Sequence, residues 1–291
     1  MLNRQKTILF MLKRAGGSAS RLLLTKWAFL LAQETPSQGG KAFYQFLPYH
    51  YGPYSFSLAR EISALVRDGF IEEPNGKTWS LTRAGFQDDP VLPVDIERDA
   101  AGVMRKYGAA SLEALLDSIY TRYPWFTVNS KEERKRVQAR PIATPAVHTL
   151  GYEGLMVDGF LDRLVRSGIQ CLVDVRHNPV SRRYGFHKST LSRLCEHLGI
   201  EYRHFPELGV PSENRTSLHI LSDYRALFER YQHDMLPRQA ATIQKVAKIL
   251  ETRPSVLVCM EAKPEFCHRS HLATALAKLT GLPIKHLAIP Q

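Results

Sequence analysis

Two acidic residues stand where apolar runs of the chain end, and they are the strongest candidates for catalysis. Asp174 lies one residue inside the end of the run 169–175, and Glu261 directly follows the run 255–260. Such runs predict buried strands of a parallel sheet, whose carboxyl ends meet at one edge. Carboxylates brought together there can perform acid–base chemistry or stabilise a cationic sugar. We therefore predict that both acids converge on one catalytic cleft, with His268 assisting as a proton donor.

The segment after Asp174 is rich in cations and aromatic rings. We predict phosphate contacts for its basic residues and for one arginine near the start of a later helix: Arg176, Arg182, Arg183, Lys188 and Arg269. We predict that three rings stack on a base: Tyr152, Tyr184 and Phe186. Cations that hold phosphate beside rings that stack bases are what a nucleic-acid cleft requires. The alternative is a basic surface loop whose aromatic residues anchor it to the core.

The four cysteines all lie in the second half of the chain, at positions 171, 195, 259 and 267. Neither they nor the histidines show the spacing of a zinc motif, and no phosphate-binding glycine loop is present. We therefore predict no metal ligands and no cofactor. Cys267 could act as a nucleophile if its pKa were lowered near a helix start, but a small buried hydrophobe is the favoured interpretation.

The elements that would position these residues begin near residue 147, where strands and helices start to alternate. We expect strands over 147–150, 169–175, 202–205, 255–260 and 284–287, with helices between them. This pattern predicts an α/β domain over residues 147–291, with an open, mostly parallel Rossmann-like sheet and helices on both faces.

The first 90 residues predict three helices followed by a hairpin. The helices are expected over 4–14, about 20–33 and 55–67, and Asn75-Gly76 between two short alternating runs marks the hairpin. Three helices and a two-stranded wing form a winged helix. This predicts duplex DNA binding, with the third helix in a groove and Lys77 on phosphate. Winged helices also bind proteins, and that alternative stays open.

Residues 91–146 are expected to be a helical connector between these two domains. The segment 88–100 is acidic and contains prolines, and the charged run 131–136 followed by Pro141 and Pro145 indicates a boundary.

Several motifs of the second half, taken in order, resemble domain-of-unknown-function family 488. They are the segment 148–154, Asp174-Val175-Arg176, Pro179, Ser181-Arg182, Gly185-Phe186, Lys188, the segment 199–202, Glu207-Leu208-Gly209, Cys259, Glu261 and Cys267-His268-Arg269. The resemblance covers about residues 147–287 and implies the α/β fold, but no activity. In the first 85 residues, the segments 65–71 and 79–85 resemble winged-helix domains, and the segment 49–55 resembles phage-associated and antitoxin-like proteins.

The chain is strongly basic, with 39 Lys and Arg against 28 Asp and Glu, a net charge of +11. Both halves share the excess, because residues 1–140 hold 20 basic and 14 acidic side chains, and the rest hold 19 and 14. Such a surplus favours a polyanionic partner, and nucleic acid is the commonest one. No apolar stretch reaches the roughly 18 residues of a membrane span, and no signal peptide is recognisable, so a cytoplasmic location is expected.

Three functions are compatible with these residues. The first is a metal-independent glycosidase of the DNA N-glycosylase type, which removes bases from modified or foreign DNA, as in phage defence. The second is a nuclease in which Asp174, Glu261 and Glu153 hold a divalent ion. The third is a winged-helix transcriptional regulator whose α/β domain senses an anionic ligand. The oligomeric state is left open.

Overall fold

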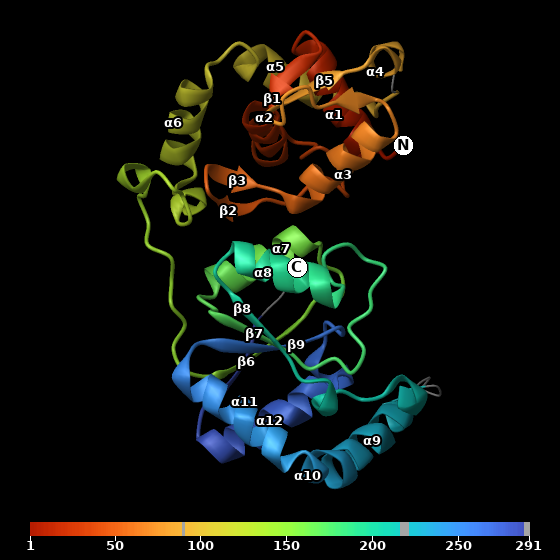
Figure 1. The fold of residues 1–291 in the computed structure, drawn as a ribbon, viewed down its shortest axis with the longest axis vertical. Coiled ribbons are helices and arrows are strands. Elements are labelled where there is room, and N and C mark those ends of the chain that lie inside the picture. The colour runs from red at the N-terminus through yellow and green to blue at the C-terminus, as the bar shows by residue number, and fades with distance from the viewer. Residues whose placement is uncertain (89–90, 216–220, 288–291) are drawn as a thin grey trace. The chain divides into compact units, whose positions relative to one another are not determined.

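The computed structural model describes residues 1–88, 91–215 and 221–287. The chain divides into two compact units, Met1–Ala139 and Arg140–Gln291, and each is described by itself (Figure 1).

Unit 1 begins with three helices and a small antiparallel sheet. The elements in chain order are α1 (Asn3–Arg14), β1 (Ser18–Ser20), α2 (Arg21–Glu34), α3 (Phe56–Arg67), β4 (Ile71–Glu72) and β5 (Thr78–Leu81), and the hairpin β2 (Leu47–Tyr49) and β3 (Gly52–Tyr54) precedes α3. The sheet has the order β1-β5-β4. The hairpin turn between β4 and β5 forms because the Asn75 side chain accepts hydrogen bonds from two backbone amides, those of Lys77 and Thr78, both at 2.9 Å.

Helix α3 is amphipathic and has a defined start. The Ser55 hydroxyl accepts a hydrogen bond from the Leu58 amide at 3.2 Å, which caps the helix. Leu58, Ile62 and Leu65 are buried along one face. The opposite face is exposed at Arg60, Ser63 and Arg67.

The segment expected as a connector contributes to the core of unit 1. It contains α5 (Val94–Tyr107) and α6 (Leu112–Arg122), which follow the short helix α4 (Arg83–Gln87) and precede the 3₁₀ turns η1 (Pro124–Thr127) and η2 (Glu133–Lys135). Ala100, Val103 and Met104 of α5 belong to the same apolar cluster as α1 and α2. Residues 94–122 therefore pack as part of this unit and do not form an extended linker.

Unit 2 contains a five-stranded, fully parallel sheet, as the alternating pattern predicts. The strands are β6 (Val147–Gly151), β7 (Cys171–Asp174), β8 (Glu201–His204), β9 (Ser255–Cys259) and β10 (Ile284–His286), in the order β10-β6-β9-β7-β8. Helices cover both faces, α7 (Val157–Arg166) and α8 (Lys188–His197) on one, and α11 (Ala240–Thr252) and α12 (His268–Thr280) on the other (Figure 1). The remaining elements are α9 (Leu221–Arg230), η5 (Tyr231–Met235), α10 (Leu236–Arg238) and the 3₁₀ turns η3 (Pro206–Leu208), η4 (Ser212–Arg215) and η6 (Pro264–Phe266).

The central strand of this sheet brings three carboxyl ends together. β9 lies between β6 and β7, with Gly151 opposite Cys259 and Asp174 opposite Val258. Every residue of these three strands is buried, because helices cover both faces. Residues that follow β6, β7 and β9 are therefore neighbours at one edge of the sheet. None of the described helices is long and apolar enough to cross a membrane.

Candidate active site

Asp174, the last residue of β7, is fully buried and held by hydrogen bonds on both carboxylate oxygens. Arg176 donates from Nε to Oδ1 at 2.8 Å and from Nη2 to Oδ2 at 2.5 Å, and the Tyr202 hydroxyl donates to Oδ2 at 2.6 Å. Burial works against the guanidinium charge, but the hydrogen bonds and charge of Asp174 raise the pKa of Arg176. The predicted roles of Asp174 in catalysis and of Arg176 on phosphate do not fit this arrangement, because each residue already binds the other.

Two of the rings expected to stack on a base stack on each other. The Tyr152 and Phe186 rings lie 4.2 Å apart and nearly parallel, and both side chains are buried. Arg176 holds this pair in place, since its Nη1 donates to the Phe186 carbonyl at 2.8 Å and to the Tyr152 hydroxyl at 3.1 Å. These two rings form part of the core, and only Tyr184 of the predicted set is partly exposed.

Three of the cations predicted to bind phosphate in unit 2 are exposed, as such contacts require. They are Arg182, Arg183 and Lys188, the last at the start of α8. The Arg183 guanidinium donates to the Leu155 carbonyl and lies 5.5 Å from the centre of the Phe186 ring. In unit 1, Lys77 is exposed next to the hairpin turn.

Arg269 is buried and holds the loop that carries Glu261. Its Nη1 donates to the Glu261 carbonyl, and its Nη2 donates to the Ala262 carbonyl at 3.0 Å. On the other side of the loop, the Glu153 carboxylate accepts from the Ala262 amide at 2.9 Å. Gly151 also lies against it, since a Cβ there would come within 1.8 Å of the Glu261 carbonyl oxygen. Arg269 and Glu153 therefore position this loop, which differs from the phosphate and metal contacts predicted for them.

Three side chains lie next to Glu261, and we term them the Cys–His cluster: Cys259, Cys267 and His268. Their ligand-type atoms all lie within 4.8 Å of one another, and all three residues are buried. His268 Nδ1 is 3.8 Å from Cys259 Sγ, and its Nε2 donates to the Val175 carbonyl at 3.0 Å. Cys259 Sγ donates to Glu261 Oε2 at 3.1 Å. The edge of the sheet thus joins two thiols, an imidazole and a carboxylate.

The Cys267 thiol is not activated for nucleophilic attack in this setting. Burial raises its pKa well above the usual value, and the neighbouring Cys259 raises it further. This agrees with the interpretation of Cys267 as a buried, unreactive thiol.

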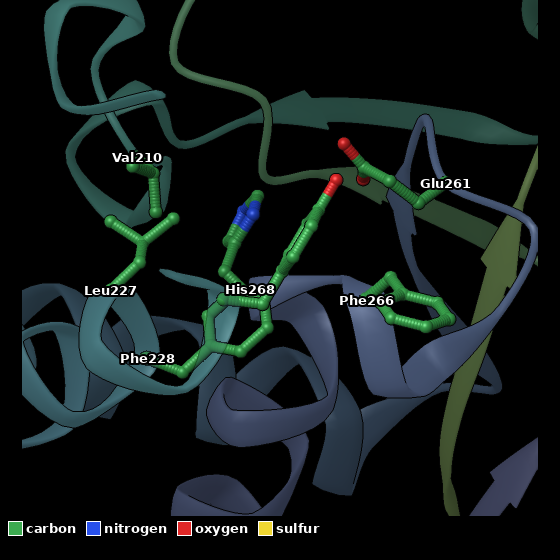
Figure 2. A pocket seen from close by; sticks show the side chains of 7 residues that line it. Val210, Leu227, Phe228, Glu261, Phe266 and His268 are labelled. Carbon is green, nitrogen blue, oxygen red and sulfur yellow. The ribbon is translucent and has the colours of Figure 1, made fainter. Parts of the chain in front are cut away.

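A small cavity of about 80 Å³ opens beside the Cys–His cluster, and we term it the edge pocket. Its lining includes Glu261 and His268 among largely apolar and aromatic walls: Val210, Tyr224, Leu227, Phe228 and Phe266. Figure 2 shows the side chains around this space, among them Glu261, which follows β9, and His268, the first residue of α12. Pockets for whole organic ligands are about 300–1,000 Å³, so the edge pocket has room for water molecules and not for a nucleobase. Asp174 does not line it.

Comparison with known families gives a match within unit 2. Residues 156–276 match DUF488, a domain of unknown function. The resemblance found in the sequence is thereby confirmed over this range, which we term the DUF488 region. Comparison of the chain with curated proteins and with solved structures gave no match.

The DUF488 region contains the whole Cys–His cluster and Glu261. The sequence grouped these residues as motifs of the family resemblance and paired His268 with Glu261, but it did not predict that the two thiols and the imidazole lie close enough to share one ligand. Cys259 ends a strand, and Cys267 and His268 stand at the amino end of α12, which packs against that strand. The separation of eight residues matches no common zinc spacing, although a strand end followed by a short turn and a helix start was a usable signal.

Proposed function

We propose that this protein is a DNA-acting hydrolase: unit 1 binds duplex DNA, and the edge pocket of unit 2 supplies the water that attacks the substrate. The observation that carries the catalytic part is the pairing of Glu261 with a water-sized space at the carboxyl edge of a parallel sheet. The edge of the sheet is where such folds place their chemistry.

Unit 1 supports the DNA-binding part through its topology. A winged helix would account for the order α1-β1-α2-α3-β4-β5, which the β2–β3 hairpin interrupts before α3, and for the sheet order β1-β5-β4. The exposed face of α3 carries Arg60 and Arg67 around the small Ser63, which suits a helix that enters a groove. Lys77 next to the wing turn would bind the flanking phosphate.

In unit 2, Glu261 would act as the general base that takes a proton from the attacking water. The exposed Arg182, Arg183 and Lys188 would hold the DNA backbone. Since the edge pocket is too small for a base, the reacting sugar or phosphate would approach its mouth while only the water enters. Modified or foreign DNA is the proposed substrate, and phage defence in the cytoplasm is the proposed setting.

Two bonds are candidates for the reaction. Cleavage of the base–sugar bond needs no metal ion, and a carboxylate near a developing cationic sugar assists it. Phosphodiester cleavage is the second candidate, because the Cys–His cluster is a group that could hold a metal ion.

The test is incubation of the full chain with plain and with base-modified duplex DNA, with and without a chelator. Abasic sites would identify base excision, and direct strand breaks would identify phosphodiester cleavage. Glu261→Gln should lower either activity by at least about 100-fold. Glu265→Gln, a change of an exposed carboxylate outside the edge pocket, should leave it unchanged. Salt-sensitive DNA binding without any cleavage product would overturn the proposed enzyme activity and favour a regulator. Absence of DNA binding would overturn the proposal that the protein acts on DNA.

A further inference from the structure

The Cys–His cluster has the composition and geometry of a transition-metal site. Around a tetrahedral zinc ion, with Zn–S near 2.3 Å and Zn–N near 2.0 Å, ligand atoms lie roughly 3.4–3.8 Å apart. Cys259 Sγ and His268 Nδ1 are 3.8 Å apart, and all three ligand atoms lie within 4.8 Å of one another. Shifts of less than about 1 Å would therefore bring all three onto one ion.

The hydrogen bond of His268 Nε2 orients the imidazole ring for metal binding through Nδ1. Val175 O can only accept, so His268 Nε2 must carry the ring hydrogen in their 3.0 Å contact. In the neutral ring this leaves the lone pair on Nδ1, the atom that faces Cys259 Sγ. Metal-binding histidines typically donate their other N–H to a carbonyl or carboxylate in this way.

We propose that Cys259, Cys267 and His268 bind one zinc ion, with water in the fourth position next to Glu261. Two thiolates and an imidazole select a soft or borderline ion over magnesium or calcium. Three protein ligands with one open position are the arrangement of catalytic zinc. Water would reach this open coordination position through the edge pocket, because both His268 and Glu261 line that pocket.

Zinc binding requires a defined movement of protons at this site. Cys259 and Cys267 would each release a thiol proton to solvent, while His268 Nδ1 binds without releasing one. The Cys259 proton is now donated to Glu261 Oε2 at 3.1 Å, so its loss would free that carboxylate to accept a proton from the zinc-bound water.

The metal site stands independently of the proposed function, and only the use of its water rests on that proposal. The two can therefore fail separately. Zinc bound without any DNA cleavage would leave the site intact and overturn the hydrolase. DNA cleavage by a protein that cannot bind zinc would leave the hydrolase intact and overturn the metal site.

The site can be tested on the full chain purified under reducing conditions without chelator. Elemental analysis should find about one zinc per chain, and metal-free protein should take up added Zn²⁺ in competition with a chromogenic chelator. Replacement by Co²⁺ should give a thiolate-to-cobalt charge-transfer absorption, which reports cysteine ligation without any substitution.

Cys259→Ser, Cys267→Ser and His268→Gln should each weaken zinc binding by at least about 100-fold and abolish or alter the cobalt spectrum. The matched control is Cys195→Ala, which changes another buried thiol outside the cluster and should keep both signals. Circular dichroism would establish that each variant is folded. Wild-type protein that binds no zinc, or a cobalt spectrum without thiolate absorption, would overturn the site. Metal-free protein that forms a Cys259–Cys267 disulfide and takes up no zinc would overturn it in favour of a redox pair.

Discussion

The guanidinium of Arg176 binds both carboxylate oxygens of Asp174, with Nε 2.8 Å from Oδ1 and Nη2 2.5 Å from Oδ2. The two residues are separated by one position, and both are almost inaccessible to solvent. Through Nη1, Arg176 also holds the Phe186 carbonyl, which joins the end of β7 to the segment before α8. The pair therefore fixes the course of the loop that leaves the sheet.

Asp174→Asn is expected to destabilise unit 2 by about 3–5 kcal/mol, because it leaves the Arg176 charge buried without its partner. All three tryptophans, Trp27, Trp79 and Trp125, lie in unit 1. Their fluorescence therefore reports on unit 1, and the loss in unit 2 is measured by hydrogen exchange in β7 and β9, which should accelerate. Arg182→Ala, in the exposed part of the same loop, should change stability by less than about 0.5 kcal/mol. Normal exchange with loss of DNA cleavage in Asp174→Asn would instead assign this residue to catalysis.

Gly151→Ala is expected to disrupt the edge pocket by displacing the loop that carries Glu261. The added methyl group would meet the Glu261 carbonyl oxygen at 1.8 Å, so the loop after β9 must move. We expect lower thermal stability and weaker zinc binding, measured by calorimetry and chelator competition. Gly102→Ala, a helical position of unit 1 with only the end of the Arg105 side chain nearby, should be neutral or stabilising by up to about 1 kcal/mol. Wild-type zinc affinity in Gly151→Ala would show that the loop position does not matter to the site.

Lys26 should make the stability of unit 1 depend on pH in the alkaline range. Its side chain is buried in α2, its Nζ donates to the Pro53 carbonyl at 2.7 Å, and burial lowers its pKa from 10.5 to about 7. Between these two values the unfolded chain binds more protons than the folded one. Stability therefore rises with pH across this window, by up to about 1.4 kcal/mol per pH unit.

Lys26→Met removes this titration. The variant should be most stable relative to wild type near pH 7, and the difference should shrink as the pH approaches 10. Denaturant unfolding followed by tryptophan fluorescence measures it, since Trp27 is the adjacent residue. A difference that stays constant from pH 7 to 10 would mean that Lys26 keeps its ordinary pKa.

If unit 1 binds DNA as proposed, substitutions on α3 and beside the β4–β5 turn should weaken that binding by removing phosphate contacts. Arg60→Ala, Arg67→Ala and Lys77→Ala should each lower duplex affinity and reduce the slope of log affinity against log salt by about one. Fluorescence anisotropy over a series of salt concentrations gives both quantities. Lys278→Ala, which removes an exposed charge from unit 2, is the control and should leave the slope unchanged. Equal effects of all four changes would contradict a specific DNA-binding face on unit 1.

The inner strands β7 and β9 of unit 2 could be predicted from sequence because each lies in a nearly continuous apolar run between helical segments, whereas β6, β8 and β10 contain polar residues. The directions of the polar side chains at the carboxyl edge of this sheet could not be predicted. Asp174 and Arg176 stand close enough in sequence to pair or to diverge, and tertiary contacts to Tyr202 and Phe186 decide the outcome. Local sequence carries no information on such contacts, which arise only when distant strands are aligned.

The short distances within the Cys–His cluster could not be predicted for a related reason. Its members belong to the end of one element and the start of the next, and the distance between them depends on how α12 packs on β9. The connector 91–146 was expected to be separate because its charged and proline-containing ends resemble a linker. The apolar residues of α5 nevertheless join the core of unit 1.

The strand order of unit 2 has a consequence for synthesis on the ribosome. β9 is the fourth strand to be made, yet β6 and β7 pair with it and not with each other. A nascent chain that has not reached residue 255 therefore carries a complete unit 1 joined to a sheet that lacks its centre. Its open strand edges can pair with other chains, so this is the stage at which a chaperone would be needed. Slow translation across residues 200–255 should lower the yield of folded protein, whereas slow translation before residue 139 should not.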